Sequence, residues 1–316
     1  MIKSPFRWIG AVAIAGMLAV VAVAAQPAAA GSGLRFEVSF PSGVRATPTD
    51  GRVFVILSKA QAPEPRLQIE GYSGDAPFFG ANVDGLRPGQ WAVVGDAADG
   101  YPYLHLQDLP AGDYYAQGLL SVYTTFPRAD GHVVKMHMDQ WEGQRFAISP
   151  GNLYSTPQPI HVEGGAKSQT IRLTLDQVIP PLGVPPDTAY VKHVRFESPL
   201  LSKFWGHPID IGATILLPKG YDTNQAIRYP VNYEQGHFSR RAPGGFGEPA
   251  VLPPGASDRL RARARQQQAF EAAWTSDDFP RMLYVTFQHP TPYYDDSYAV
   301  DSPNSGPYGQ AITQEL

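Results

Sequence analysis

Short runs of alternating apolar and polar residues dominate the first half of the chain, and most of them end at Gly, Pro or Asp. Residues 34–40 have the period of two that is typical of a strand with one buried face. Residues 52–58 are almost continuously apolar, which favours a central strand. Further strands are predicted at residues 66–70, 91–94, 103–107, 114–123, 159–162 and 169–175. Short strands separated by turns predict an all-β domain, a β-sandwich, over residues 31–178.

The pattern changes at residues 179–187, where four prolines stand close together. Proline cannot donate to a β-ladder, and Pro-rich segments are extended and stiff. We therefore predict a connector here and a domain boundary, with a second domain over residues 188–316.

The second domain alternates strand and helix patterns. Strands are predicted at residues 189–197, 209–217, 229–234 and 282–287, and the last two are apolar enough to be buried. A Gly/Pro-rich loop, residues 235–256, leads to a helix that is capped by Ser257 and has Asp258 in its first turn. The helix positions expected to face inward are Leu260, Ala264, Gln267, Phe270 or Glu271, and Trp274.

This strand–helix–strand order predicts a right-handed crossover between two parallel strands, residues 229–234 and 282–287. Ligands of such sheets bind beyond the carboxyl ends of the strands. The loops that follow these strands, residues 235–238 and 288–290, are therefore expected to face one cleft. On the alternative interpretation, the first strand is an ordinary core strand and Gly236 serves only a turn. A sheet ending at residues 282–287 would expose that strand along an edge.

Three segments of the second domain have the sequences LPKGYD at residues 217–222, RYPV at residues 228–231 and DSPNSGPYG at residues 301–309. In this order they resemble the esterases of the α/β-hydrolase fold, a group that includes enterochelin-esterase-like and esterase D-like enzymes. The resemblance covers residues 190–316. It implies an α/β-hydrolase-type domain that acts on a small-molecule carboxylic ester.

The resemblance also implies the positions of site residues. The turn after the YPV strand would line the oxyanion hole, with the backbones of Gly236, His237 and Phe238 as candidate donors. The family usually has His before Gly, so the reversed order here leaves open which N–H group donates. Residues expected to line the cleft are His289, Asp301, Ser302, Asn304 and Tyr308. Loop capping is the alternative role of this loop region.

A serine hydrolase of this fold presents its nucleophile in a G-x-S-x-G elbow, and the acid and histidine follow in the chain. Ser257 lacks the closing glycine of this motif, Ser73 has its second glycine one position early, and Ser305 lacks the leading glycine. We therefore expect residues 188–316 to be the N-terminal part of an incomplete hydrolase domain. The catalytic Ser, Asp and His would lie beyond Leu316, with no catalytic residue in this chain, which is expected to be inactive alone.

The first 30 residues have the order of a signal peptide. Lys3 and Arg7 precede an apolar run at residues 9–24, and three alanines give a small-x-small cleavage pattern before Gly31. Cleavage and export, to the periplasm or outside the cell, are predicted, with no membrane association afterwards. An uncleaved anchor is the alternative. The chain has no cysteine, so the fold is expected to stand without disulfides.

The charge balance argues against a nucleic-acid partner, because 25 Lys and Arg face 29 Asp and Glu and give a net charge of −4. Arg259, Arg261, Arg263 and Arg265 alternate along the predicted helix, so they spread around it as a solvated surface. No cofactor and no metal are expected. The alternative function is a secreted, non-catalytic binding protein, in which aromatic residues such as Trp91 or Trp141 would stack on a carbohydrate.

Overall fold

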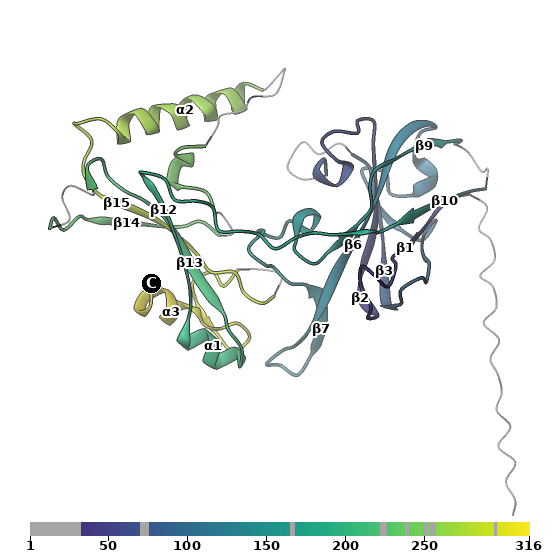
Figure 1. Ribbon diagram of the computed structural model, residues 1–316, viewed down its shortest axis with the longest axis horizontal. Coiled ribbons are helices and arrows are strands. Elements are labelled where there is room, and N and C mark those ends of the chain that lie inside the picture. The colour runs from purple at the N-terminus through teal and green to yellow at the C-terminus, as the bar shows by residue number, and fades with distance from the viewer. Residues whose placement is uncertain are drawn as a thin grey trace, which may run out of the picture. The chain divides into compact units, whose positions relative to one another are not determined.

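The structure is a computed structural model that describes residues 33–69, 76–164, 168–221, 226–237, 240–248, 252, 257–293 and 296–316 (Figure 1). Ser32–Leu316 forms a single unit by its internal contacts. The predicted signal peptide, residues 1–30, lies outside the described residues. Within the described ranges, none of the helices combines the length and the apolar character that crossing a bilayer requires. Export stays a prediction.

The part of the chain before the proline-rich connector is built from two β-sheets. In the smaller sheet, β1 lies between β10, to which it is parallel, and β4, to which it is antiparallel. In the larger sheet, β2 lies between β3 and β6, as its apolar sequence predicts. The strands of the smaller sheet are β1 (Leu34–Ser39), β4 (Ala92–Val94) and β10 (Gln169–Thr174). The larger sheet contains β2 (Thr49–Ser58), β3 (Phe78–Leu86), β5 (Asp99–Tyr101), β6 (Gly112–Pro127), β8 (Leu153–Tyr154) and β11 (Gln177–Val178), with β7 (Val133–His137) and β9 (Gln158–Val162) paired to β6.

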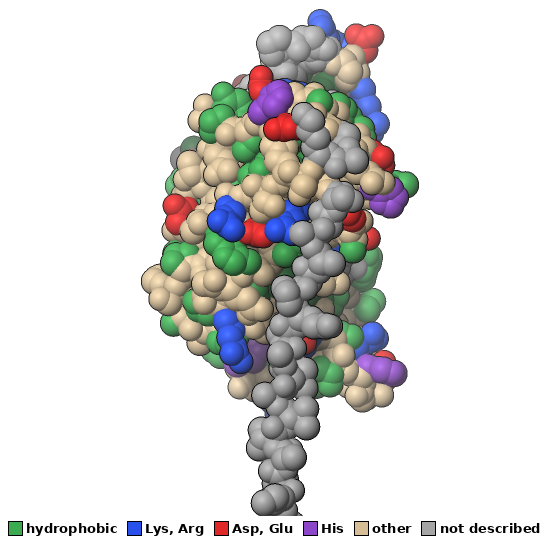
Figure 2. Space-filling model, turned by 90° about the vertical axis from the view of Figure 1, so that its right-hand side faces the viewer, with side chains coloured by type: hydrophobic (Ala, Val, Ile, Leu, Met, Phe, Trp, Pro, Cys, Tyr) green, Lys and Arg blue, Asp and Glu red, His purple; other side chains and the backbone are tan. Residues whose placement is uncertain are grey.

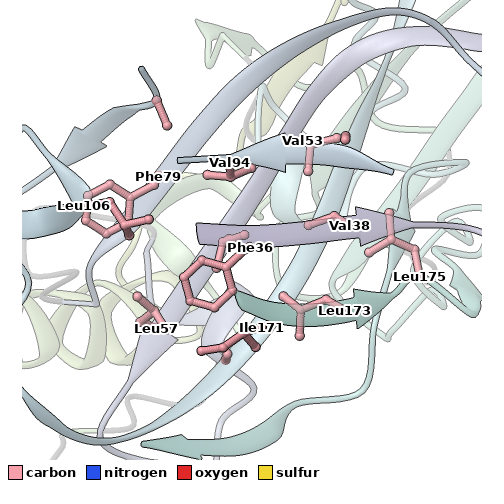
Figure 3. Close-up of a cluster of buried hydrophobic side chains, with 14 of the residues drawn as sticks. Phe36, Val38, Val53, Leu57, Phe79, Val94, Leu106, Ile171, Leu173 and Leu175 are labelled. Atoms are coloured by element: carbon pink, nitrogen blue, oxygen red, sulfur yellow. The ribbon is translucent and has the colours of Figure 1, made fainter. Parts of the chain in front are cut away.

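One hydrophobic core joins these two sheets (Figure 3). Phe36 and Val38 of β1 contribute to it from the smaller sheet, and Val53 and Leu57 of β2 contribute from the larger one. Alternate residues of both strands belong to this core because side chains at i and i+2 share a face. The β-rich character predicted for this part is confirmed, and the arrangement is compatible with the predicted sandwich.

Two predicted strands of this part are wrong. In place of the strand at residues 66–70, the described residues contain a 3₁₀ turn at Pro65–Leu67, because Pro65 has no N–H for a ladder. In place of the strand at residues 103–107, the chain makes a 3₁₀ turn at Leu106–Asp108, and Leu106 inserts into the core. The apolar residues of this segment predicted a strand, but Leu106 alone is buried there and the side chains do not form an alternating face.

The second part contains a four-stranded sheet in the order β12–β13–β15–β14. β14 and β15 are parallel, as predicted, with α2 between them in the chain, while β12 and β15 are both antiparallel to β13. The elements are β12 (Val191–Glu197), β13 (Asp210–Leu216), β14 (Val231–Gln235), α2 (Asp258–Trp274) and β15 (Leu283–Gln288). Residues 179–187 have neither helix nor strand, as expected of the connector, although nothing here tests the domain boundary.

Helices cover both faces of this sheet (Figure 1). On one face, Trp274 of α2 packs in a cluster with Leu216 of β13, and its indole N–H donates to the carbonyl of Leu217 at 2.8 Å. On the other face, α1 (Pro199–Trp205) and α3 (Tyr308–Gln314) pack together over Ile211. Successive side chains of β13 point to opposite faces of the sheet, so Leu216 packs under α2 and Ile211 packs under α1 and α3.

The structure corrects the predicted burial of the crossover. All five residues of β14 are exposed, and among the described strands β14 pairs only with β15, so β14 is an edge strand. The strand at residues 282–287, expected at an edge, corresponds to β15 and is interior. Helix α2 packs mainly through its C-terminal half: Leu260, expected to face inward, is 45% exposed, whereas Trp274 is 2% exposed. The N-terminal half therefore leaves β14 uncovered.

Charged side chains are distributed as the composition predicts. The arginines at positions 259, 261, 263 and 265 of α2 are all exposed. On the face shown in Figure 2, basic and acidic side chains are interspersed among polar and apolar ones instead of gathering by sign. The described residues of this face therefore present no large patch of one charge sign.

Candidate active-site cleft

The loops that follow β14 and β15 meet, as predicted. His237 lies two residues beyond β14, in a left-handed backbone conformation with φ of 49°. Its Nδ1 lies 2.7 Å from Oδ2 of Asp296, which belongs to the loop after β15. The Asp296 side chain is fully buried while that of His237 is 56% exposed, so the carboxylate holds an imidazole that faces solvent. Tyr298 packs edge-on against the same ring.

His289 lies directly after β15 and is fully buried. Its Nδ1 is 2.7 Å from Oγ of Ser297, and its Nε2 is buried with no hydrogen-bond partner among the residues that the structure describes. Burial lowers the pKa of His289, and the charge of Asp296 opposes that effect only in part, so the ring is neutral at pH 7. A buried, neutral imidazole with one unsatisfied nitrogen is poised to hydrogen-bond a further group.

These contacts do not form a catalytic triad. Ser297 is buried, and its Oγ also accepts the N–H of Ala299 at 3.1 Å, as in a turn-stabilising serine. Asp296 pairs with His237 rather than with His289. A triad requires one histidine that bridges the acid and the nucleophile, and the described residues of this cleft use two separate histidines instead.

Three residues predicted to line the cleft make their hydrogen bonds elsewhere. Asp301 accepts from the N–H and the side-chain amide of Gln310, which lowers the pKa of Asp301 and caps the start of α3. Ser302 Oγ accepts the N–H of Ser305 at 2.9 Å. Asn304 Oδ1 accepts the N–H of Ala129 from the turn between β6 and β7. The alternative role, loop capping, describes Asp301 and Ser302.

Tyr308 supports the cleft from behind. Its ring is fully buried, and its hydroxyl donates to the carbonyl of Pro290 at 2.7 Å. Pro290 in turn forms an isolated bridge with Asp296, so Tyr308 fixes the loop that carries both the acid and His289. Of the predicted residues, His237, His289 and Tyr308 thus belong to this region, and Gly236 directly precedes His237 in the chain. Phe238 lies outside the described residues.

The β-rich part contributes to the same region. The N–H of Asp139 donates to the carbonyl of Tyr293, and the ring of Phe126 packs on that of Tyr293. A small cavity combines this segment with the ends of β14 and β15. Its lining residues are Asp139, Trp141, Gly143, His237, Arg240, Gln288 and Pro290. The cleft is therefore bounded by both parts of the chain.

Asp139 is the most perturbed carboxyl group of this region. Burial and, secondarily, the charge of Glu142 raise the pKa of Asp139 to about 6, although its two oxygens accept the N–H groups of Trp141 and Gln144 at 2.7 Å. Glu142 itself is buried and lies 2.5 Å from Nε2 of His137. The charge of the neighbouring Glu142 adds to the effect of burial, and this explains why Asp139 resists ionisation.

A second cavity, of about 500 Å³, opens on the α2 side of β14. Gly236 and Glu234 line it together with Tyr284, Arg263 and Phe270. It coincides with the stretch of β14 that α2 leaves uncovered, and neither His237 nor His289 lines it. We therefore attribute it to the incomplete cover of the sheet, and we assign the chemistry to the histidine side.

Sequence reasoning did not identify Ser297 or Asp139 as parts of the site. Ser297 follows His289 by eight residues in an irregular loop, where no periodicity relates the two side chains. Asp139 belongs to the other part of the chain, and only tertiary structure brings it to Pro290 and His237.

Two comparisons with known proteins return nothing for this chain. No protein-family model matches it, and no curated protein matches it at a significant level.

Proposed function

We propose that this chain belongs to an exported serine-esterase-like hydrolase of carboxylic esters, with an N-terminal β-sandwich and an α/β-hydrolase-type domain that begins at residue 188. The observation that supports this most is the parallel pairing of β14 with β15, which places Gly236 and His237 beside the His289 loop. Ligands of such sheets bind at this end of the strands. The resemblance of the LPKGYD, RYPV and DSPNSGPYG segments supports the same conclusion.

In the proposed reaction a serine activated by a histidine attacks the ester carbonyl, and the negative charge that develops on the carbonyl oxygen is stabilised by N–H donors. The turn after β14 would supply these donors. Its positive φ at His237 is typical of turns in which successive N–H groups converge on an anion. The buried carboxylate of Asp296 fixes the His237 ring beside that turn.

The nucleophile is not part of this proposal for residues 1–316, because no serine among them has the G-x-S-x-G pattern. We expect purified residues 31–316 neither to hydrolyse p-nitrophenyl acetate nor to react with a serine-directed fluorophosphonate. The natural reading frame beyond codon 316 should encode a G-x-S-x-G segment, and the natural full product should do both.

A pair of variants in the natural product tests the oxyanion assignment. Gly236→Pro removes the backbone N–H and should lower kcat by about 100- to 1,000-fold, the usual effect of losing one oxyanion donor. Gly236→Ala keeps the N–H and is the matched control. The proposal fails if residues 31–316 alone are labelled by the fluorophosphonate, or if the frame closes without a G-x-S-x-G segment.

A further inference from the structure

The segment between β7 and β8 presents a half-buried tryptophan at a mixed, polar pocket. Trp141 lines a cavity of about 460 Å³ that we call the Trp141 pocket. The polar and aromatic side chains that define it are Asp139, Gln140, Trp141, Arg195, His207 and Asp210. Pro290 and Thr291, from the loop after β15, close one side.

The backbone around Trp141 is held in an unfavourable conformation. Trp141 has φ of 78°, a left-handed conformation that bulky residues rarely adopt. Two carboxylates fix it: Asp139 accepts the N–H of Trp141 at 2.7 Å, and Glu142 accepts the N–H of Gln140 at 2.6 Å. Glu142 is anchored by buried His137. Strained positions that are fixed from several sides concentrate at functional sites.

The indole ring is also fixed from the second part of the chain. The guanidinium of Arg195 stacks over it at 4.3 Å from the ring centroid, and Arg195 is held by Asp210 at 2.7 Å. A Cβ at Gly212 would lie 3.2 Å from the indole edge, so a residue without a side chain lets the ring approach β13. The ring is thus immobilised while it remains accessible from the pocket.

The chemistry of this pocket selects its ligand class. A rigid aromatic wall favours a flat or apolar ring face, and the surrounding carboxylates, guanidinium and amide suit a ligand rich in hydroxyl groups, which both donate and accept. An acyl chain would shield these polar groups from water without forming hydrogen bonds to them. An anionic ligand would meet the Asp139 and Asp210 carboxylates. A sugar ring satisfies both requirements.

We propose that the Trp141 pocket binds a sugar ring, with Trp141 as its stacking surface and Asp139, Arg195 and Asp210 as hydrogen-bonding partners. Asp139, Trp141 and Pro290 line both this pocket and the small cavity beside His237. A sugar bound here would therefore lie beside the cavity that contains His237. If the proposed esterase function holds, on which only this last step rests, the substrate is an esterified carbohydrate and the β-rich part selects it.

Calorimetry on the full chain tests the binding step without requiring hydrolysis. The probes are xylo-, cello-, manno- and chito-tetraoses, each with and without O-acetyl groups. At least one is expected to bind, and Trp141→Ala should weaken it by at least about 10-fold, in line with the loss of one stacking contact. Trp91→Ala is the matched control, because Trp91 is also accessible, at 42%, and is also stacked by an arginine, Arg172, but lies outside the pocket.

Trp141→Phe guards against a folding defect, since it keeps a ring at this position and should retain most of the binding. If Trp141→Ala fails to fold, Asp210→Asn takes its place as the test variant. The proposal then requires that Asp210→Asn loses binding and that Trp91→Ala retains it. The proposal is overturned if none of the probes binds, or if binding survives Trp141→Ala or is lost in Trp91→Ala. Sugar binding by a chain whose natural product has no esterase activity would refute the proposed function and leave this pocket assignment standing.

Discussion

Replacement of Asp139 by Asn should change how the stability of the protein depends on pH. The pKa of this carboxyl is raised from an ordinary value of 3.8 to about 6, first by burial and then by the charge of Glu142. Each unit of pKa corresponds to about 1.4 kcal/mol between the protonated and ionised forms. The ionised native state is therefore less favourable by about 3 kcal/mol at neutral pH.

The sign follows from proton binding. The folded protein binds this proton more tightly than the unfolded chain, so between about pH 4 and about pH 6 the native state carries more protons. The free energy of unfolding then decreases as the pH rises through this range. Below it, both states are protonated and the penalty is absent. Above it, both are ionised and the penalty is complete.

Asn cannot ionise, so it removes this slope, but it also lacks one acceptor. Asp139 accepts the N–H groups of both Trp141 and Gln144, and one of these would face the NH₂ group of Asn at a cost of about 1–3 kcal/mol. Asp139→Asn should therefore be less stable than the wild type near pH 4 by that amount. Near pH 8 it should be equal in stability or more stable by up to about 2 kcal/mol.

Urea unfolding of both proteins at intervals from about pH 4 to about pH 8 measures this difference, because the other titrating groups cancel in the comparison. The difference between variant and wild type should change by about 3 kcal/mol across the range. The same substitution at exposed Asp108 should leave the difference constant. A difference that does not vary with pH for Asp139→Asn would show that folding does not raise the pKa of this carboxyl, and the reasoning would be refuted.

Two further substitutions test the fold around the cleft. Tyr308→Phe removes the hydroxyl that donates to the carbonyl of Pro290. It should lower the free energy of unfolding in urea by about 1–2 kcal/mol and speed amide exchange in the loop after β15. Tyr101→Phe, at an exposed ring, is the control and should change neither measurement. Tyr233 lies on the edge strand β14 and is 63% exposed. Tyr233→Lys adds a charge to this edge and should reduce concentration-dependent self-association in sedimentation velocity. Phe204→Lys on α1 should not reduce it. Self-association that Tyr233→Lys leaves unchanged would exclude the β14 edge as its cause.

The crossover could be predicted from the sequence because its signals are local. Ser257 caps α2 by accepting the N–H of Leu260, and a buried apolar run at β15 follows the helix. Chain connectivity then restricts the two flanking strands to a parallel pair. The position of a strand within the sheet is harder to predict, because it depends on which other strands lie beside it. The apolar run before Gly236 predicted burial, yet β14 is exposed, since no local pattern records which neighbours cover a strand.

The site divides along the same line. The sequence placed His237 and His289 in adjoining loops because both follow strand ends, and strand ends are readable. It did not place Asp139, because that carboxyl reaches the cleft through the contact of Asp139 N–H with Tyr293, between parts of the chain that are far apart in sequence. Contacts of this kind depend on how surfaces fit, and no periodicity encodes them.

The two buried acids of the cleft, Asp296 and Asp139, differ in their surroundings. Asp296 accepts a hydrogen bond from the N–H of Tyr298 in its own loop and pairs with the His237 imidazole of the loop after β14. Asp139 accepts two backbone N–H groups but lies beside a second carboxylate, Glu142. The imidazole of His137 pairs with Glu142. The β-rich side thus supplies an acid whose pKa is raised to about 6. A hydroxyl-rich ligand at Trp141 would meet this acid, because a protonated carboxyl both donates and accepts hydrogen bonds, as such a ligand does.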